Sequence, residues 1–516
     1  TSTTVLQPLW VATATATDLS TNSTSEFSKA MYANTLGPIT FVVNNDGGYH
    51  LTKGGSKVVL NGTMTLARAI ELANQHPGTD QIVFAIPPQV TVTTDTMGFP
   101  VFSHAGDSRV VLIDTNLPDI TDTVVIDGSR LAWPQWPADE LLPGYPADTN
   151  SANDYSLWFR NATNGIVISD NQRPEDAFLN PGASAGFTVI RNFPEISGQN
   201  GVGITIATSK GNVNIQNIQA GNGGFSGIPG LSGFVKGGIL IQNSPENIIG
   251  GADKGQGIQI NKIGAGTGIT ITGALSTKNL VQQTKIGDLF GTASDAILID
   301  DGASQNIIGG FTSSPVNTGN LIVRSNKAGI HIRNNSNGNR IQRNFIGNDG
   351  DSKAIPNAQD GIFIEDSSDN LIGGQNLQAG NLISGNTENG IRIVGLTSKN
   401  NQIQSNIIGL NAAGDAGLPN SANGVLIENA PFTQVGSTTT AANYISANNL
   451  NGVRIVGAGA AGSFVVNNRI GINLAGDKKL GNVEDAIKAF MASAKSHTRG
   501  SDTTDPTKTA MTHKTL

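Results

Sequence analysis

Five ionisable side chains lie within or directly after copies of a repeated tetrapeptide and could together perform acid–base chemistry on a sugar. The tetrapeptide is Gly-Ile-x-Ile or a close variant, and strand geometry directs its two apolar residues to one face. The residue x and the residue after the tetrapeptide therefore point outward. In successive copies these outward residues include Asp300, His331, Arg333, Glu365 and Arg392, with Asp301 and Asp366 at the edge. If the copies stack as parallel strands about 4.8 Å apart, the side chains form one patch.

This patch has two alternative interpretations, one catalytic and one structural. Carboxylate, histidine and arginine groups can abstract a proton and neutralise charge in a polysaccharide lyase, or supply acid–base cleavage in a glycoside hydrolase. Opposite charges on neighbouring strands can instead form a purely structural ladder on a solvated sheet. The sign alternates from Asp300 to Arg333, Glu365 and Arg392, which favours the ladder.

An oxygen-rich segment suggests a second kind of site. The run Asn348-Asp-Gly-Asp351 resembles a calcium-binding loop, with Asp349 and Asp351 as the candidate ligands. The equivalent segments 411–415 and 473–477 carry one acidic residue each, which favours a polar turn. We expect no cofactor other than this possible calcium ion.

The tetrapeptide belongs to a longer repeat that predicts the fold. Its copies are spaced 28 to 35 residues apart and begin at Gly203, Gly238, Gly268, Ala296, Gly329, Gly361, Gly390, Gly424 and Gly452. Two further short apolar segments, each introduced by asparagine, separate successive copies. Three strands per coil would stack on those of the next coil, bury a continuous Ile/Val core and let the asparagines hydrogen-bond along the turns. The sequence therefore predicts an all-β, right-handed parallel β-helix with about 30 residues per coil.

This pattern resembles the right-handed parallel β-helix superfamily that includes pectate lyases, over residues 60–128 and 186–483. The segment TLARAIELANQHPGTDQIVFAIP, followed by LPDITDTVVIDGS, is similar to the CSLREA-type N-terminal cap of bacterial members. The leading cysteine of that motif is missing, and Met64 lies near its place. The resemblance implies the fold and a cap, and leaves the activity open.

The ends of the chain differ from the repeat. Residues 1–60 form a Thr/Ser-rich arm, 61–128 the cap and first strands, 129–185 an irregular insertion, 186–483 the coils and 484–516 a C-terminal helix with a polar tail. Apolar spacing predicts a helix over 63–74 that covers the open end of the coils, and strands at 81–86, 110–113 and 124–126. A second, short helix is predicted over 483–495, where the repeat fades.

Composition narrows the classes of function. Only 14% of the residues are charged and 5% are aromatic, whereas glycine numbers 64, as expected of a turn-rich β protein. A net charge of −7 gives no basic footprint for nucleic acid, and no apolar run is long enough to span a membrane. Cysteine is absent, which excludes disulfides and thiolate sites.

We therefore expect a non-catalytic extracellular or cell-surface protein with a structural or adhesive role. Its arm and coil ends could drive end-to-end assembly into oligomers or filaments, for example by adding the VATATAT segment to a neighbour's sheet edge. The alternative is a polysaccharide lyase or hydrolase that uses the charged patch. The regular coils carry no tryptophan and one tyrosine, Tyr444, which weakens the enzyme hypothesis because sugar-binding enzymes usually offer aromatic platforms.

Overall fold

The computed structural model describes the solenoid body and short strands near both termini. The described ranges from the helix onward are 65–75, 80–84, 91–94, 100–103, 110–113, 115–130, 156–159, 162–170, 188–193, 195–218, 230–253, 255–310, 318–375, 377–437, 441–490 and 514–515. Before them lie the strand pieces 11–12, 17–18, 23–24, 31–32, 40–43, 50–51 and 57–58. Most of the predicted arm, residues 13–16 of the VATATAT segment and most of the polar tail lie outside the described residues.

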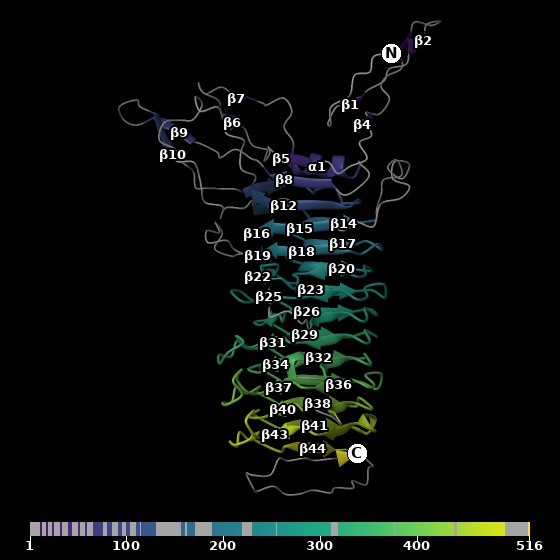
Figure 1. The fold of residues 1–516 in the computed structure, drawn as a ribbon, viewed down its shortest axis with the longest axis vertical. Coiled ribbons are helices and arrows are strands. Elements are labelled where there is room, and N and C mark those ends of the chain that lie inside the picture. The colour runs from purple at the N-terminus through teal and green to yellow at the C-terminus, as the bar shows by residue number, and fades with distance from the viewer. Residues whose placement is uncertain are drawn as a thin grey trace.

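Three long parallel sheets run the length of the molecule, as Figure 1 shows. The first sheet holds the Gly-Ile-x-Ile strands and orders its eleven described strands as β14 (Ile166–Ser169), β17 (Val202–Ala207), β20 (Gly237–Gln242), β23 (Thr267–Thr272), β26 (Ile297–Asp300), β29 (Ile330–Ile332), β32 (Ile362–Glu365), β35 (Ile391–Val394), β38 (Val425–Glu428), β41 (Val453–Val456) and β44 (Ile487–Phe490). Each strand pairs in parallel with the corresponding strand of the next coil, so the chain forms the predicted parallel β-helix.

The other two sheets supply the remaining strands of each coil. The second sheet contains β5 (Thr40–Val43), β8 (Asp80–Phe84), β12 (Val124–Arg130), β15 (Thr188–Phe193), β18 (Val213–Ile218), β21 (Ile248–Ile249), β24 (Leu280–Val281), β27 (Ile307–Gly309), β30 (Arg340–Gln342), β33 (Leu371–Gly373), β36 (Gln402–Gln404), β39 (Gln434–Gly436), β42 (Phe464–Val466) and the antiparallel β45 (Lys514–Thr515). The third contains β11 (Val110–Ile113), β13 (Ser156–Phe159), β16 (Glu195–Gly198), β19 (Gly230–Ser232), β22 (Gln259–Asn261), β25 (Lys285–Ile286), β28 (Leu321–Ile322), β31 (Phe345–Ile346), β34 (Leu382–Ile383), β37 (Ile407–Ile408), β40 (Tyr444–Ile445) and β43 (Arg469–Ile470).

Small antiparallel pairs lie outside the three sheets. These are β1 (Val11–Ala12) with β4 (Met31–Tyr32), β2 (Thr17–Asp18) with β3 (Ser23–Thr24), β6 (His50–Leu51) with β7 (Lys57–Val58), and β9 (Thr91–Thr94) with β10 (Pro100–Ser103). Two 3₁₀ turns, η1 (Leu377–Ala379) and η2 (Ala458–Ala460), also lie in the described part of the chain. Within the described part of the chain, no helix has the length and hydrophobicity needed to span a bilayer.

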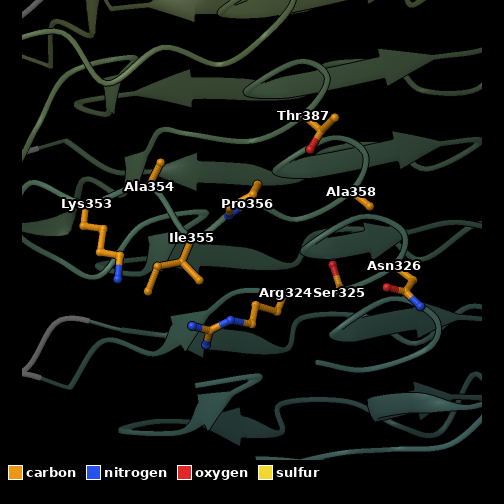
Figure 2. A pocket seen from close by; sticks show the side chains of 9 residues that line it. All are labelled: Arg324, Ser325, Asn326, Lys353, Ala354, Ile355, Pro356, Ala358 and Thr387. Atoms are coloured by element: carbon orange, nitrogen blue, oxygen red, sulfur yellow. The ribbon is translucent and has the colours of Figure 1, made fainter. Parts of the chain in front are cut away.

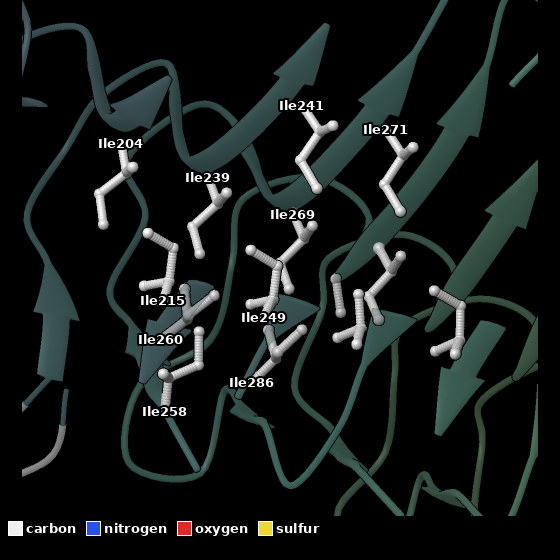
Figure 3. Close-up of a cluster of buried hydrophobic side chains, with 14 of the residues drawn as sticks. Ile204, Ile215, Ile239, Ile241, Ile249, Ile258, Ile260, Ile269, Ile271 and Ile286 are labelled. Carbon is white, nitrogen blue, oxygen red and sulfur yellow. The ribbon is translucent and has the colours of Figure 1, made fainter. Parts of the chain in front are cut away.

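The core is a stack of inward-pointing aliphatic side chains. Ile391 and Ile393 of β35 are fully buried and lie in register with Ile362 and Ile364 of β32. Figure 3 shows isoleucines from the three sheets meeting in the interior. Because each fully buried isoleucine contributes about 1.5–3 kcal/mol, the repeated columns supply most of the driving force for folding.

Buried asparagines tie consecutive coils together at the turns. One ladder lies just before the third-sheet strands and comprises Asn320, Asn344, Asn381, Asn406, Asn443 and Asn468. In each step the side-chain oxygen of one asparagine accepts hydrogen bonds from the backbone N–H and the Nδ2 of the preceding one, as between Asn344 and Asn381 at 3.0 Å for both. The predicted hydrogen bonding along the turn columns is confirmed.

Longer loops project from every second coil after β31, β37 and β43. Each loop closes on itself through an isolated antiparallel bridge, and the loops contact one another across the intervening short coil. The backbone N–H of Ala412 donates to the carbonyl of Asp351 at 2.8 Å, and that of Leu474 to Gly414 at 2.8 Å. The loops follow Ile346-Gly347, Ile408-Gly409 and Ile470-Gly471, which recur every 62 residues, and they form a row of stacked loops along one edge.

A helix lies at the N-terminal end of the solenoid. Helix α1 (Leu66–Ala73) starts at Thr65, whose hydroxyl accepts the backbone N–H of Arg68 at 3.2 Å. It packs against β5 and β8 with its apolar face buried. At its other end, the side chain of Asn74 donates to the carbonyl of Asp119 and accepts the N–H of Thr121. The helix predicted from apolar spacing is thus present and joined to the first coils.

The predicted C-terminal helix is wrong within the described residues. Residues 487–490 form strand β44, which pairs in parallel with β41 and continues the first sheet by one coil. Ala486-Ile487-Lys488-Ala489 fits the repeat in the same way as the alanine variant at Ala296. The free edge of β41 offers backbone partners that outweigh the weak helical spacing. Residues 491–495 lie outside the described part.

Coil strands also occur outside the predicted coil boundaries. β13 and β14 lie in the segment interpreted as an irregular insertion, and both pair with strands of later coils. β5 lies in the segment interpreted as an arm and pairs with β8. The solenoid therefore begins well before Gly186.

Candidate functional site

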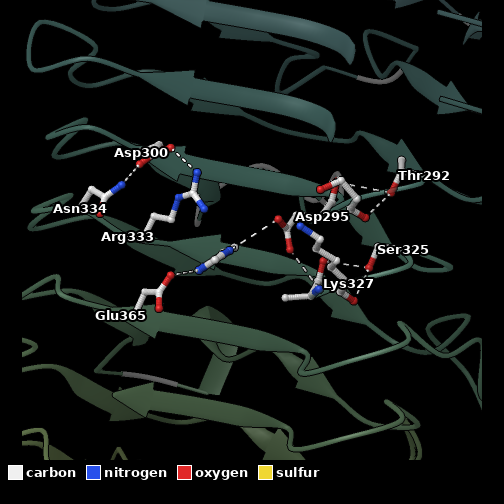
Figure 4. A network of polar contacts seen from close by, with 11 residues as sticks. Thr292, Asp295, Asp300, Ser325, Lys327, Arg333, Asn334 and Glu365 are labelled. Atoms are coloured by element: carbon white, nitrogen blue, oxygen red, sulfur yellow. Dashed lines mark hydrogen bonds and ion pairs between the residues drawn. The ribbon is translucent and has the colours of Figure 1, made fainter. Parts of the chain in front are cut away.

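The five predicted site residues share one outward face of the first sheet. The register aligns Leu298 of β26, His331 of β29, Phe363 of β32 and Arg392 of β35 in one column. The neighbouring column holds Asp300, Arg333 and Glu365, and Figure 4 shows these side chains on adjacent strands. The spacing argument therefore placed them on the correct face.

Asp300 and Arg333 form the first pair within this patch. The Nη2 of Arg333 lies 2.8 Å from Oδ2 of Asp300, and Nδ2 of Asn334 donates to Oδ1 at 2.8 Å. Partial burial alone would raise the pKa of Asp300, but the hydrogen bonds from Arg333 and Asn334 outweigh it and hold that pKa below its ordinary value. The bond to Asp300 in turn raises the pKa of Arg333 despite its burial. Both groups are therefore fixed in their charged forms.

His331 lies between two carboxylates. Its Nε2 is 3.1 Å from Oε1 of Glu365, and its Nδ1 is 3.5 Å from Oδ2 of Asp295. Only 10% of the His331 side chain is exposed. The other oxygen of Asp295 accepts the backbone N–H of Ala328 at 3.1 Å, which orients the carboxylate toward the ring.

Asp295 is a member of this cluster that the sequence analysis missed. It precedes the tetrapeptide instead of lying within it, and it reaches the x residue of the next coil. Asp360 occupies the same position before its own tetrapeptide. The recurrence of an acid just before Ala296 and Gly361 is the signal that could have identified it.

Arg392 is directed away from the other four predicted residues. Phe363 stacks on His331 with ring centroids 4.6 Å apart and an interplanar angle of 18°. The guanidinium of Arg392 lies over the Phe363 ring, 5.0 Å from its centre. Its Nη2 pairs with Oε2 of Glu428 at 3.3 Å. Phe363 therefore separates the His331 cluster from the Arg392 pair.

The two aspartates predicted at the edge of the patch lie in turns. Asp301 and Asp366 both adopt a left-handed backbone conformation, with φ of 51° and 46°. The Oδ1 of Asp366 accepts a hydrogen bond from the hydroxyl of Thr397 at 2.7 Å. Their positions in turns give them a local structural role.

The candidate calcium ligands lie in the first of the projecting loops. Oδ1 of Asp349 accepts the backbone N–H groups of Asp351 and Lys353 at 2.9 and 3.0 Å. Burial alone would raise the pKa of Asp349, but the backbone hydrogen bonds from Lys353 and Asp351 together outweigh it and hold that pKa below its ordinary value. Among the described residues, no group of three His, Asp or Glu side chains is arranged to hold a metal ion. Calcium binding at Asp349 and Asp351 stays a prediction.

Comparison with known proteins yields structural likeness at low identity. No protein-family model matches the chain, and no curated protein matches it. The A-module of the mannuronan C-5 epimerase AlgE6 from Azotobacter vinelandii is 12% identical, with 83% of this chain and 95% of that chain covered and a TM-score of 0.39. The likeness concerns the fold alone.

Two further solved structures show the same level of similarity. The periplasmic alginate epimerase AlgG is 12% identical over 81% of this chain and 74% of its own, with a TM-score of 0.27. The Dettilon tailspike protein gp208 is 16% identical over 82% of this chain and 64% of its own, with a TM-score of 0.30. The chemistry of the present chain is therefore argued from its own residues.

The arrangement of the patch has a clear chemical consequence. Asp300, Arg333, Glu365, Arg392 and His331 each contact an opposite or hydrogen-bonding partner on a neighbouring coil. Such contacts tie β26 to β29, β29 to β32 and β35 to β38 laterally, as expected of charge pairs on neighbouring strands, and no ion pair joins β32 to β35 among the described residues. Any acid–base role would require one of these pairs to open.

Proposed function

We propose that this chain is a non-catalytic structural rod of the extracellular space or cell surface. One observation carries the proposal: the acidic and basic side chains of the patch contact one another across consecutive coils, as ion pairs between Asp300 and Arg333 and between Arg392 and Glu428, and at 3.1 Å between His331 and Glu365. Groups committed to such pairs stabilise the sheet and are poorly available for proton transfer to a substrate. The stacked isoleucines and asparagines supply the rigidity that a rod requires.

We further propose an adhesive or assembling role carried by the two ends. Helix α1 would act as the lid of the N-terminal end, in the manner of a CSLREA-type cap, and the arm would add a strand to a neighbouring molecule. Electron microscopy with light scattering tests assembly directly. Removing residues 1–30 should abolish oligomers or filaments; an unchanged mass would contradict a role of the arm.

The decisive test of the non-catalytic proposal compares turnover with stability. Wild-type protein and the His331→Gln and Glu365→Gln variants are incubated with polyuronates and neutral polysaccharides, and reducing ends and unsaturated products are measured. We expect no product from any of them and a lower melting temperature for both variants. Glu246→Gln is the control, because the Lys278–Glu246 pair at 3.2 Å is exposed and its loss should change stability little.

A second candidate function, a polysaccharide lyase or hydrolase, is favoured by the contacts of His331. Asp295 holds Nδ1 and leaves Nε2 directed at Glu365, an arrangement in which a displaced Glu365 would free the imidazole to act as a base. This function predicts product formation that Asp295→Asn and His331→Gln abolish while the melting temperature changes little. That result would overturn the structural proposal.

A further inference from the structure

A pocket of about 410 Å³ lies along the third-sheet edge, away from the charged patch. It is formed where the turn after β28 faces the end of the projecting loop after β31, as Figure 2 shows. Two cationic side chains, Arg324 and Lys353, line it together. Pockets of several hundred Å³ are of the size that holds small ligands or single sugar units.

Arg324 is anchored by the coil that precedes it. Its Nη1 donates to the carbonyl of Gly287 at 2.9 Å and also to that of Asp288. The backbones approach closely here, since a Cβ on Gly291 would come within 2.0 Å of the Arg324 carbonyl oxygen. The guanidinium is thus held in place by neutral acceptors, which satisfy one nitrogen without neutralising its charge.

Lys353 is placed in the pocket by a closed loop. The side chain of Asp349 caps this loop by accepting the N–H of Lys353, and the loop is closed further by the N–H of Ile355 donating to Gly347 at 2.8 Å. The Lys353 side chain is exposed. In the described part of the chain, no carboxylate forms an ion pair with Lys353 or Arg324. The carboxylate of Asp288 is itself engaged by Lys285 at 3.5 Å.

The rest of the pocket has an apolar wall on one side and polar side chains on the other. Ile355 and Pro356 form an apolar wall, with Ile355 beside the two cations in Figure 2. Asn326 and Thr387 lie on the other side, and both are exposed. The turns that carry them are joined to the loop, because Thr387 donates its N–H to the carbonyl of Asn357 at 3.0 Å and Ala358 donates its N–H to the carbonyl of Ser325 at 2.8 Å.

We propose that this pocket binds the carboxylate-bearing unit of an anionic saccharide. Arg324 and Lys353 would hold the carboxylate, Ile355 and Pro356 would cover the apolar C–H face of the ring, and Asn326 and Thr387 would contact hydroxyl groups. Two cations without acidic partners favour an anion, and the apolar wall favours a sugar over a small inorganic ion. The inference is independent of the first-sheet patch and holds for a rod or an enzyme.

The test measures binding by isothermal titration calorimetry with full-length protein and three probes: a hexameric oligogalacturonate, maltohexaose and inorganic phosphate. We expect binding of the oligogalacturonate that weakens with added salt, and no measurable binding of maltohexaose. Lys353→Ala should weaken oligogalacturonate binding about tenfold, the effect of losing one hydrogen bond to a charged group. Lys399→Ala is the matched control, because Lys399 is an exposed lysine in a turn between the first and second sheets.

Arg324 is tested by a conservative substitution, because removing its side chain would leave the carbonyls of Gly287 and Asp288 without this donor and could perturb the fold. Arg324→Lys keeps the charge while losing the fork geometry, and we expect weaker binding at an unchanged melting temperature. The proposal is overturned if oligogalacturonate does not bind, if Lys353→Ala binds as tightly as wild type, or if phosphate binds as tightly as the sugar. Equal binding of maltohexaose would overturn the role of the cations.

Discussion

Oδ1 of Asp360 accepts two hydrogen bonds from Asn389 on the next coil, one from the backbone N–H at 3.0 Å and one from Nδ2 at 2.8 Å. In the same way, Oδ1 of Asn389 accepts from Nδ2 of Asn423, and Oδ1 of Asn423 accepts from Nδ2 of Asn451. The carboxylate of Asp360 is therefore the first acceptor in a column of asparagines. Asp360 is 2% exposed. Burial raises its pKa to about 6, against the hydrogen bonds from Asn389 that lower it.

The Asp360→Asn variant should be more stable than wild type at neutral pH. In the folded state Asp360 takes up its proton near pH 6, whereas in the unfolded chain it does so near 3.8. Its contribution to stability is therefore largest below about pH 4, falls as the pH rises to 6 and stays low above it. The difference of roughly two pKa units corresponds to about 3 kcal/mol.

Chemical unfolding of both proteins at pH 4, 5, 6 and 7 measures this effect. The two should be alike at pH 4 and diverge toward pH 7, because asparagine keeps the acceptor used by Asn389. Asp301→Asn serves as a control at an exposed turn. A less stable Asp360→Asn protein at pH 7 would show that the carboxylate is needed in its charged form.

The Asp300–Arg333 pair should stabilise the coils modestly. The Arg333 side chain is 37% exposed, so solvent screening limits the coupling to about 1 kcal/mol or less. A double-mutant cycle with Asp300→Asn and Arg333→Gln measures it. Since the pKa of Asp300 is lowered, the coupling should be present above pH 4 and fade as the pH falls through that lowered pKa. A pH-independent coupling would contradict this assignment.

Replacing a central ladder asparagine should be far more damaging than removing a charge. Asn381 donates to the carbonyl of Ile341 at 2.7 Å and to Asn406 at 2.9 Å, and it accepts from Asn344. Asn381→Ala removes these buried hydrogen bonds, including the acceptor of the Asn344 backbone N–H, and should cost about 3 kcal/mol or more, at about 1–3 kcal/mol for each of the three groups that lose a bond. Urea unfolding compares it with Asn449→Ala at an exposed position. Equal midpoints for the two variants would refute the importance of the ladder.

Hydrogen exchange can verify the last coil. The N–H groups of Gly452 and Val453 donate to the carbonyls of Asp485 and Ala486, each at 2.9 Å. A chain ending at Asn482 should lose protection at these two amides, whereas those of Gly390 and Ile391 should keep theirs. Unchanged protection at Gly452 and Val453 would mean that residues 483–490 do not form the strand.

The phase of the repeat was predictable because its signal is local. An isoleucine pair flanked by glycine and asparagine reports both the buried face and the turn, and each copy reinforces the next. The same local reasoning failed at Ile487, since a helical spacing of Val483, Ile487 and Phe490 competes with pairing to a strand edge more than 30 residues away. The coil that contains β13 and β14 was missed although Gly165-Ile-Val-Ile168 matches the tetrapeptide, because this copy begins 38 residues before Gly203, outside the 28–35-residue spacing of the others.

The sequence by itself determined the solenoid, its inward isoleucines and the set of charges on the outward face, because all three depend on a two-residue strand period. Only the tertiary structure decided which charges meet. Asp295 contacts His331 because the turn brings the end of one coil against the strand of the next, and Arg392 turns to Glu428 because Phe363 fills the space beside it. The pocket at Arg324 and Lys353 likewise depends on how a short coil faces a long loop, a relation in space that no residue spacing encodes.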